Sequence, residues 1–201
     1  MVVLGASGAT GRHVVSTAVE RGHRVVAPVR RPGTFQPQER LTETSWPAVA
    51  DALDDALTGV DVVISTLGGA DKGPTTVCTD GIRSAITAMQ AASVKRLIAV
   101  SAHGVLETHD KSLYSRAVWA GVAGKMRDKE TMESLIKASD LYWTIVRPPA
   151  LSDHDPIGTY RTGTDLPIRL WTSIGRADLA TFLVDEAENP RYVRACPRIT
   201  R

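Results

Sequence analysis

Apolar residues fall into short runs that are separated by stretches with helical spacing. The runs lie at 2–4, 24–29, 60–67, 95–101 and 142–147. In the first intervening stretch Val14, Val15, Ala18 and Val19 share one face, as in an amphipathic helix. Strands that alternate with helices predict an α/β fold, a Rossmann-type doubly wound parallel sheet.

The same pattern locates the remaining elements. It predicts helices at 9–21, 47–57, 75–92, 111–119, 125–138 and 175–186. Residues 32–44 are polar and contain prolines, which predicts a loop in which no third strand is visible. Two short strands are predicted at 166–172 and 192–196. Residues from about 150 to 175 are predicted to form a substrate-side loop region in a small C-terminal lobe.

Composition narrows the classes of protein that the chain can represent. With 201 residues, 43% of them hydrophobic, it fits one globular domain over 1–201. The net charge is +2 and no basic stripe accompanies it, so we expect no nucleic-acid partner. No apolar run is long enough to span a membrane, and the chain opens directly on its first strand. We therefore expect a cytoplasmic monomer or homodimer that acts on a small molecule.

The cysteines and histidines show no metal-binding pattern. Cys78 and Cys196 are far apart in sequence, and the five histidines form no ligand motif. We expect free thiols and no metal site.

The main chemical motif is a glycine turn, Gly5-Ala6-Ser7-Gly8-Ala9-Thr10-Gly11-Arg12, between the first strand and the first helix. Glycines at this spacing allow a sharp turn, a close approach of a ligand and tight packing of helix on strand. The free amides at the helix start then favour a bound pyrophosphate. The motif predicts a dinucleotide site.

Basic residues after the second strand indicate which dinucleotide binds. An acidic residue there would accept hydrogen bonds from the ribose hydroxyls of NAD, but this chain has Arg30 and Arg31. Guanidinium groups pair with a 2′-phosphate, so we predict NADP rather than NAD, with Arg12 as a third positive charge. The alternative is that these arginines form a solvated loop.

Further candidate residues follow strands whose ends meet at the same edge of a parallel sheet. Thr66, Leu67 and Gly68 follow one strand, Ser101 and His103 follow another, and Pro148 follows a third. Ligands in such sheets bind at the carboxyl ends of the strands, so these positions are candidates for the cofactor and substrate sites.

Four segments together resemble a known family. They are residues 5–12, Val60-Asp61-Val62-Val63-Ile64, 141–148 (LYWTIVRP) and Gly175-Arg176-Ala177-Asp178-Leu179-Ala180. In this order they resemble the atypical short-chain dehydrogenase/reductases with an NAD(P)H-binding domain, which include biliverdin reductase B, flavin reductase-like and NmrA-like proteins. The resemblance covers nearly the whole chain.

The resemblance implies roles for individual residues. Residues 5–12 would hold the pyrophosphate, Arg30 the 2′-phosphate and Thr66 to Gly68 the adenosine. Ser101 would lie near the nicotinamide ribose, and Pro148 and Pro149 would flank the nicotinamide amide. Lys129 would face the ribose, although it could equally be a solvated helix lysine.

Two departures from the family pattern limit the mechanism. Residues 41–46 lack the Gly-Asp that commonly ends the third strand, which leaves the adenine contacts there unassigned. The catalytic tyrosine and lysine pair of ordinary short-chain dehydrogenases is also missing. Ser101 and His103 remain as candidate donors to a substrate oxygen, with solvent as an alternative source of the proton.

Three functions are compatible with these observations. The first is an NADPH-dependent reductase of a small conjugated or carbonyl substrate such as a flavin- or quinone-like ring. The second is an NmrA-like NADP sensor without turnover, and the third is an NADP-dependent epimerase or isomerase.

Overall fold

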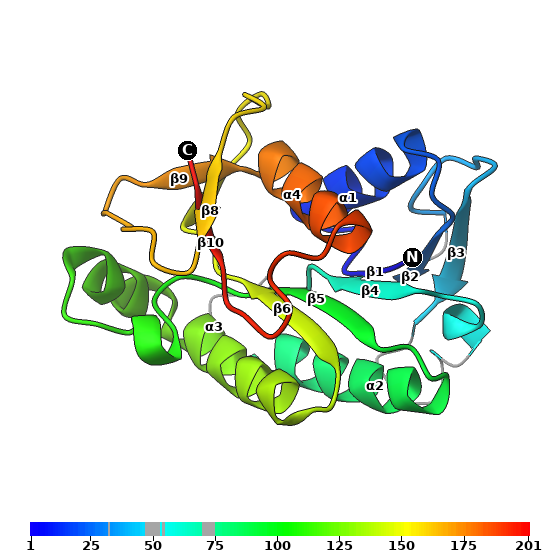
Figure 1. Cartoon of the computed structure of the whole chain (residues 1–201), viewed down its shortest axis with the longest axis horizontal. Coiled ribbons are helices and arrows are strands. Elements are labelled where there is room, and N and C mark those ends of the chain that lie inside the picture. The colour runs from blue at the N-terminus through cyan, green and yellow to red at the C-terminus, as the bar shows by residue number, and fades with distance from the viewer. Residues whose placement is uncertain (32, 47–52, 54, 70–74) are drawn as a thin grey trace.

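Six parallel strands form the central sheet (Figure 1). The computed structural model describes residues 1–31, 33–46, 53, 55–69 and 75–201. The strand order is β3 (Leu41–Ser45), β2 (Val25–Val29), β1 (Val2–Leu4), β4 (Val62–Ser65), β5 (Arg96–Val100) and β6 (Tyr142–Val146). All neighbouring strands pair in parallel, which confirms the predicted Rossmann-type sheet.

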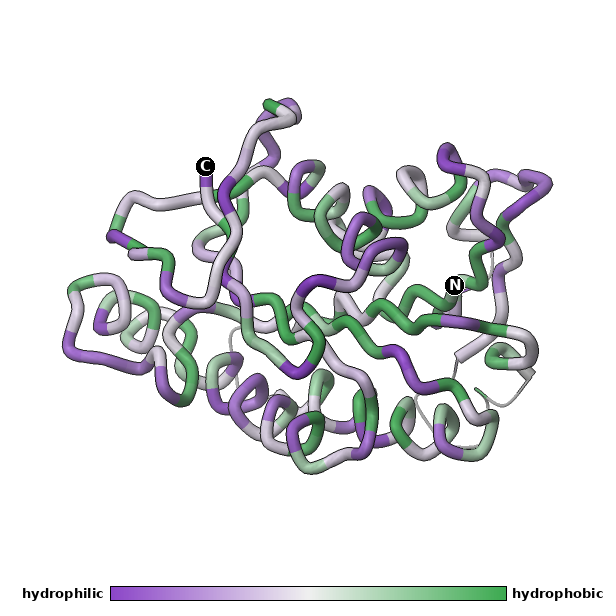
Figure 2. The backbone as a smooth tube through the Cα atoms, in the orientation of Figure 1, coloured by the Kyte–Doolittle hydropathy of each residue, from purple (hydrophilic) through white to green (hydrophobic). Residues whose placement is uncertain are grey.

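Helices cover both faces of this sheet (Figure 1). The helices α1 (Ala9–Glu20) and α4 (Arg176–Glu188) pack together on one face, and α2 (Val77–Ala91) and α3 (Leu113–Ala138) pack on the other. Side chains alternate between the faces, so Val2 and Leu4 belong to the core under α2 and α3 while Val3 belongs to the other core. Figure 2 shows the resulting apolar colouring along the central strands.

Two small sheets form a C-terminal lobe beyond β6. In one, β7 (Ala150–Ser152) pairs in parallel with β9 (Ser173–Gly175), and in the other β8 (Arg161–Gly163) pairs antiparallel with β10 (Arg198–Thr200). Asp178, in the first turn of α4, accepts hydrogen bonds from the amides of Ile157 and Gly158. This buried carboxylate fixes the loop between β7 and β8 to the main domain.

The prediction that residues 32–44 form a loop without a third strand was wrong. Residues 41–45 form β3, an edge strand that pairs with β2 along its whole length. Its sequence, LTETS, contains one aliphatic residue and no buried position. An edge strand needs no continuous apolar run because only one side of it meets another strand, and threonine suits it.

Two other predicted strands were misplaced. Residues 166–172 pair with no described strand; they end in a turn in which the Thr172 amide donates to the Arg169 carbonyl. Residues 192–196 turn at Arg194, whose φ is 56°, and the strand begins later, at Arg198.

Two of the predicted helical regions also differ from the structure. Most of the predicted helix at 47–57 lies outside the described residues; its end forms the short helix η2 (Asp55–Leu57). The helices predicted at 111–119 and 125–138 form the two parts of α3, which begins only at Leu113 and has non-helical dihedrals between the two parts, at Val122.

A buried ion pair joins the end of β6 to α3. Arg147 directly follows β6, is 2% exposed, and donates two hydrogen bonds to the fully buried Glu133. Its third nitrogen lies 3.0 Å from Glu107, which follows the loop after β5. Burial lowers the pKa of Arg147, but the two carboxylates outweigh it and raise the pKa above its ordinary value. The pair therefore fixes the carboxyl end of β6.

Replacing Arg147 with methionine is expected to lower the free energy of unfolding by about 3–5 kcal/mol, because Glu133 would remain buried without its main partner. Urea unfolding measures this loss. Lys95→Met is the control, since Lys95 pairs with the solvent-exposed Asp140 and its loss should change the free energy of unfolding far less. Equal losses in the two variants would contradict a buried, structure-holding pair.

Candidate functional site

The glycine turn lies at the carboxyl end of β1 and has a shape that only glycine permits. Gly5 has a φ of +74°, and a Cβ added there would lie 3.0 Å from the backbone of Thr66. A Cβ on Gly11 would lie 2.2 Å from the carbonyl oxygen of Gly5. Gly11 therefore brings α1 into direct backbone contact with the turn before it, and Gly5 brings that turn against the chain that follows β4.

The start of α1 is open to an anion. Gly8 occupies the N-cap, and within the described residues no side chain caps this helix. The first turn of α1 also carries no acidic residue. Its free amides and the positive end of its dipole thus face outward, as a pyrophosphate requires.

The N-terminus of α2, in contrast to that of α1, is capped by a carboxylate. The buried carboxylate of Asp128, on α3, accepts hydrogen bonds from the amides of Cys78 and Thr79, each at 2.9 Å. The Thr79 hydroxyl donates to the same carboxylate. A negative charge already satisfies this helix end, which leaves α1 as the anion-binding terminus of the two.

The strand register places the predicted contacts in one row. Leu4 pairs with Ser65, Ser65 with Ala99, and Ala99 with Ile145, so the strand ends lie level across the sheet. Thr66 links the turn to β4: its amide donates to Leu4, and its hydroxyl contacts the carbonyls of Leu4 and Gly5.

A pocket of about 370 Å³ lies over the part of the sheet edge formed by the ends of β2, β1 and β4. It is lined by Gly5, Ser7, Gly8, Pro28, Val29, Arg30, Trp46, Thr66, Leu67, Gly68, Gly69, Thr75, Thr76, Val77, Asp80 and Gly81. Of the predicted adenosine-side positions, the structure thus brings Thr66, Leu67 and Gly68 together with the glycine turn. Ala6, Ala9, Thr10 and Gly11 support the turn without lining the pocket.

The three predicted phosphate-binding arginines occupy different places. Arg30 is exposed and lines the pocket. Arg12 donates to the carbonyls of Ser7 and Thr34 and lies over the ring of Phe35. Arg31 is exposed and does not line the pocket. Arg30 is therefore the guanidinium best placed for a 2′-phosphate.

Trp46 was missed by the sequence analysis. It follows β3 directly, is 7% exposed, lines the pocket, and its indole nitrogen has no partner among the described residues. It stands in the segment whose adenine contacts were left open. The missing signal was β3 itself, because the residue after a parallel strand lies at the ligand-binding edge.

A second group of predicted residues gathers at the ends of β5 and β6. The Ser101 amide donates to Val146, the His103 amide donates to Pro148, and the Lys129 ammonium donates to Val100 at 3.0 Å. Ser101 Oγ and His103 Nδ1 are buried, with no hydrogen-bond partner within the described part of the chain. Pro148 and Pro149 are also buried here. Two buried polar atoms of this group are therefore free to hydrogen-bond a ligand beside the row of strand ends.

The pKa of His103 is lower than the ordinary histidine value, on which its predicted role as a proton donor depended. Burial lowers its pKa to about 4, and the positive charges of Arg198 and Arg147 contribute, with Asp110 opposing. The imidazole is therefore neutral at pH 7. A neutral imidazole can donate or accept a hydrogen bond, but it has no acidic proton to release.

Comparison with known proteins assigns the fold and the cofactor class. Residues 5–190 match the NAD(P)H-binding family. The chain belongs to this family. The resemblance inferred from the sequence is thereby confirmed, together with a nicotinamide cofactor, while the choice between NAD and NADP is a separate question.

Individual relatives of this NAD(P)H-binding protein have diverged in sequence. A Bacillus subtilis (strain 168) protein described as the uncharacterized sugar epimerase YhfK is 29% identical over 177 residues, covering 82% of this chain and 78% of its own. ChuY, described as an anaerobillin reductase from Escherichia coli O157:H7, superposes with a TM-score of 0.84 at 22% identity, over 98% of this chain and 95% of its own. The oxidoreductase ylbE from Lactococcus lactis gives 0.83 at 17% identity, over 98% and 89%. The two structures show a shared fold.

Among the residues that the structure describes, no three histidine, cysteine, aspartate or glutamate side chains are grouped to hold a metal ion. In that part of the chain no helix has the length and apolar character to cross a membrane.

The lowered pKa of His103 has a measurable consequence for stability. An unfolded chain binds this proton below about pH 6.5, whereas the folded protein binds it only near pH 4, so acid favours unfolding in that window. Between pH 7.5 and 5.5, wild type should lose up to about 1 kcal/mol more unfolding free energy than His103→Gln. Urea unfolding at both pH values tests this, and an NMR titration of His103 near pH 6.5 would contradict it.

Proposed function

We propose that this chain is an NADPH-dependent reductase that delivers hydride to a small conjugated or carbonyl acceptor, with a flavin- or quinone-like ring as the first class to test. One observation carries the proposal. Arg30, the glycine turn, Thr66 and the group of Ser101, His103 and Lys129 follow one another along one edge of the sheet. This is the order in which a dinucleotide would present its 2′-phosphate, pyrophosphate and nicotinamide.

Arg30 supports NADPH over NADH. Its guanidinium lines the pocket at the end of β2, where a carboxylate would instead suit free ribose hydroxyls. Arg12 is held by Ser7 and Thr34 close to the same turn and adds positive charge to this side. The adenine is proposed to lie toward Trp46.

The nicotinamide half has three proposed partners. Ser101 Oγ is buried without a partner in the described chain and can hydrogen-bond the ribose. The Lys129 ammonium donates to the carbonyl of Val100, the residue directly before Ser101, so it lies at the same strand end. Pro148 and Pro149 form an apolar wall beside it. When bound, the nicotinamide supplies the hydride, and these residues orient the ring and exclude water.

Proton delivery is assigned to solvent, with His103 polarising the acceptor. Neutral His103 can donate one hydrogen bond to an acceptor oxygen, as a neutral imidazole does in other enzymes. No tyrosine is followed four residues later by lysine in this sequence. Tyr160 is further occupied, because its hydroxyl donates to Asp185. Acceptors that need no strong acid, such as conjugated rings, therefore fit best.

Purified protein should oxidise NADPH in the presence of a flavin or quinone, followed at 340 nm. Aldehydes and NADH serve as comparison arms. Tight NADP binding measured by calorimetry without turnover of any acceptor would contradict the reductase and favour the sensor. Interconversion of a sugar without net NADPH consumption would favour an epimerase, the activity named for YhfK.

Arg30→Glu is expected to weaken NADPH binding by at least about tenfold and NADH binding far less, because only NADPH carries the 2′-phosphate. Calorimetric titration of both coenzymes measures the difference. Arg24→Glu is the matched control, since Arg24 precedes the other end of β2 and is exposed. Equal weakening of both coenzymes by Arg30→Glu would refute the phosphate contact.

A further inference from the structure

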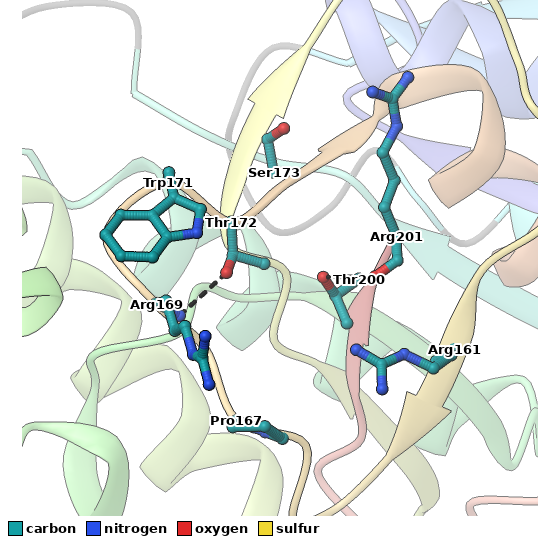
Figure 3. A pocket seen from close by; sticks show the side chains of 8 residues that line it. All are labelled: Arg161, Pro167, Arg169, Trp171, Thr172, Ser173, Thr200 and Arg201. Carbon is teal, nitrogen blue, oxygen red and sulfur yellow. Dashed lines mark hydrogen bonds between the residues drawn. The ribbon is translucent and has the colours of Figure 1, made fainter.

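A second pocket lies in the C-terminal lobe and shares no lining residue with the pocket described above. Its volume is about 530 Å³, and it is lined by Arg161, Pro167, Arg169, Trp171, Thr172, Ser173, Thr200 and Arg201. We call it the arginine pocket. In Figure 3, Arg161 and Arg169 extend toward each other across Pro167 and Thr200, while Arg201 extends away from them.

The strand pairings place the arginine pocket beyond the edge of the main sheet. Arg147, at the end of β6, is bridged to Arg198, and Thr200 lies two residues further along β10. Thr200 pairs with Arg161 across the antiparallel β8–β10 ladder. Two strand residues advance about 6.6 Å, so the pocket opens just past the carboxyl end of β6. Substrates of such sheets bind on this side.

Among the described residues, no acidic side chain forms an ion pair with the two arginines on which the arginine pocket is centred, Arg161 and Arg169. Nearby Arg176, by contrast, is paired with Asp153 at 2.7 Å. No acidic side chain lines the pocket. Guanidinium groups that converge without an acid repel each other, and they match the oxygens of a phosphate or carboxylate.

The pocket also offers a flat apolar surface and hydroxyl groups. The Trp171 side chain is 79% exposed at its rim, beside Arg169 (Figure 3). Thr172, Ser173 and Thr200 supply hydroxyls to the lining. An exposed indole next to arginines suits a planar ring that carries an anionic group.

We propose that the arginine pocket binds an oxyanion, a phosphate or carboxylate, carried by the substrate, so that the ring to be reduced extends from it toward the end of β5. This inference rests on the proposed reductase function and adds the charge of its substrate. We base it on Arg161 and Arg169, because Arg201 extends away from them (Figure 3).

FMN and riboflavin provide a matched pair of probes, since they share one ring and differ in a phosphate. Calorimetry on the NADP⁺-saturated protein should give a Kd for FMN at least about fivefold below that for riboflavin. Arg161→Gln and Arg169→Gln should each reduce this ratio, in binding and in KM, by about fivefold. Arg24→Gln removes one exposed arginine at the other side of the sheet and should leave the ratio unchanged.

The outcomes separate this inference from the proposed function. Loss of the FMN preference in both pocket variants supports it, even if no acceptor is reduced. An unchanged ratio in both variants overturns it, even if flavins are good substrates. Inorganic phosphate that binds as tightly as FMN overturns the assignment to a substrate in favour of a free anion. No binding of FMN or phosphate at millimolar concentration also overturns it.

Discussion

The close approach of α1 to the first turn is the constraint on which the cofactor site depends. It requires that position 11 have no side chain, because a Cβ there would overlap the Gly5 carbonyl. With that contact in place, α1 starts directly above the end of β1, and its free amides lie in the row of strand ends. The apolar sheet gives this row its rigidity, since Val2, Val3 and Leu4 are fully buried from both sides.

The C-terminal lobe lies beyond the carboxyl end of β6, at the far end of this row. Asp178 and the Arg147–Glu133 pair hold, respectively, the β7–β8 loop and the end of β6. Among the described residues, side-chain groups without a hydrogen-bond or ion-pair partner include Arg30, the Ser101–His103 group and the two arginines of the arginine pocket, which lie along this edge of the sheet. Such groups match the elongated, anionic ligands that we propose.

The sequence was sufficient to predict the parts of the fold that depend on local patterns. Apolar runs located β1, β2, β4, β5 and β6, and glycine spacing located the turn, because strand and helix periodicity are properties of neighbouring residues. The polar edge strand β3 lacked that signal and was not predicted. Trp46 was missed for the same reason, because it directly follows β3. Asp128 was also missed as the cap of α2, since it lies some fifty residues along the sequence from the amides whose hydrogen bonds it accepts. The neutral state of His103 follows from burial, which no local pattern reports.

Asp128 and Lys129 are consecutive residues of α3, so their side chains leave the helix about 100° apart. The Asp128 carboxylate accepts a hydrogen bond from the start of α2, and the Lys129 ammonium donates one to the last carbonyl of β5. Any rotation of α3 about its own axis would therefore break the cap of α2 and move the Lys129 ammonium away from the end of β5 at the same time. The orientation of Lys129 is thus coupled to the stability of α2, although its ammonium donates its hydrogen bond to β5 and not to that helix.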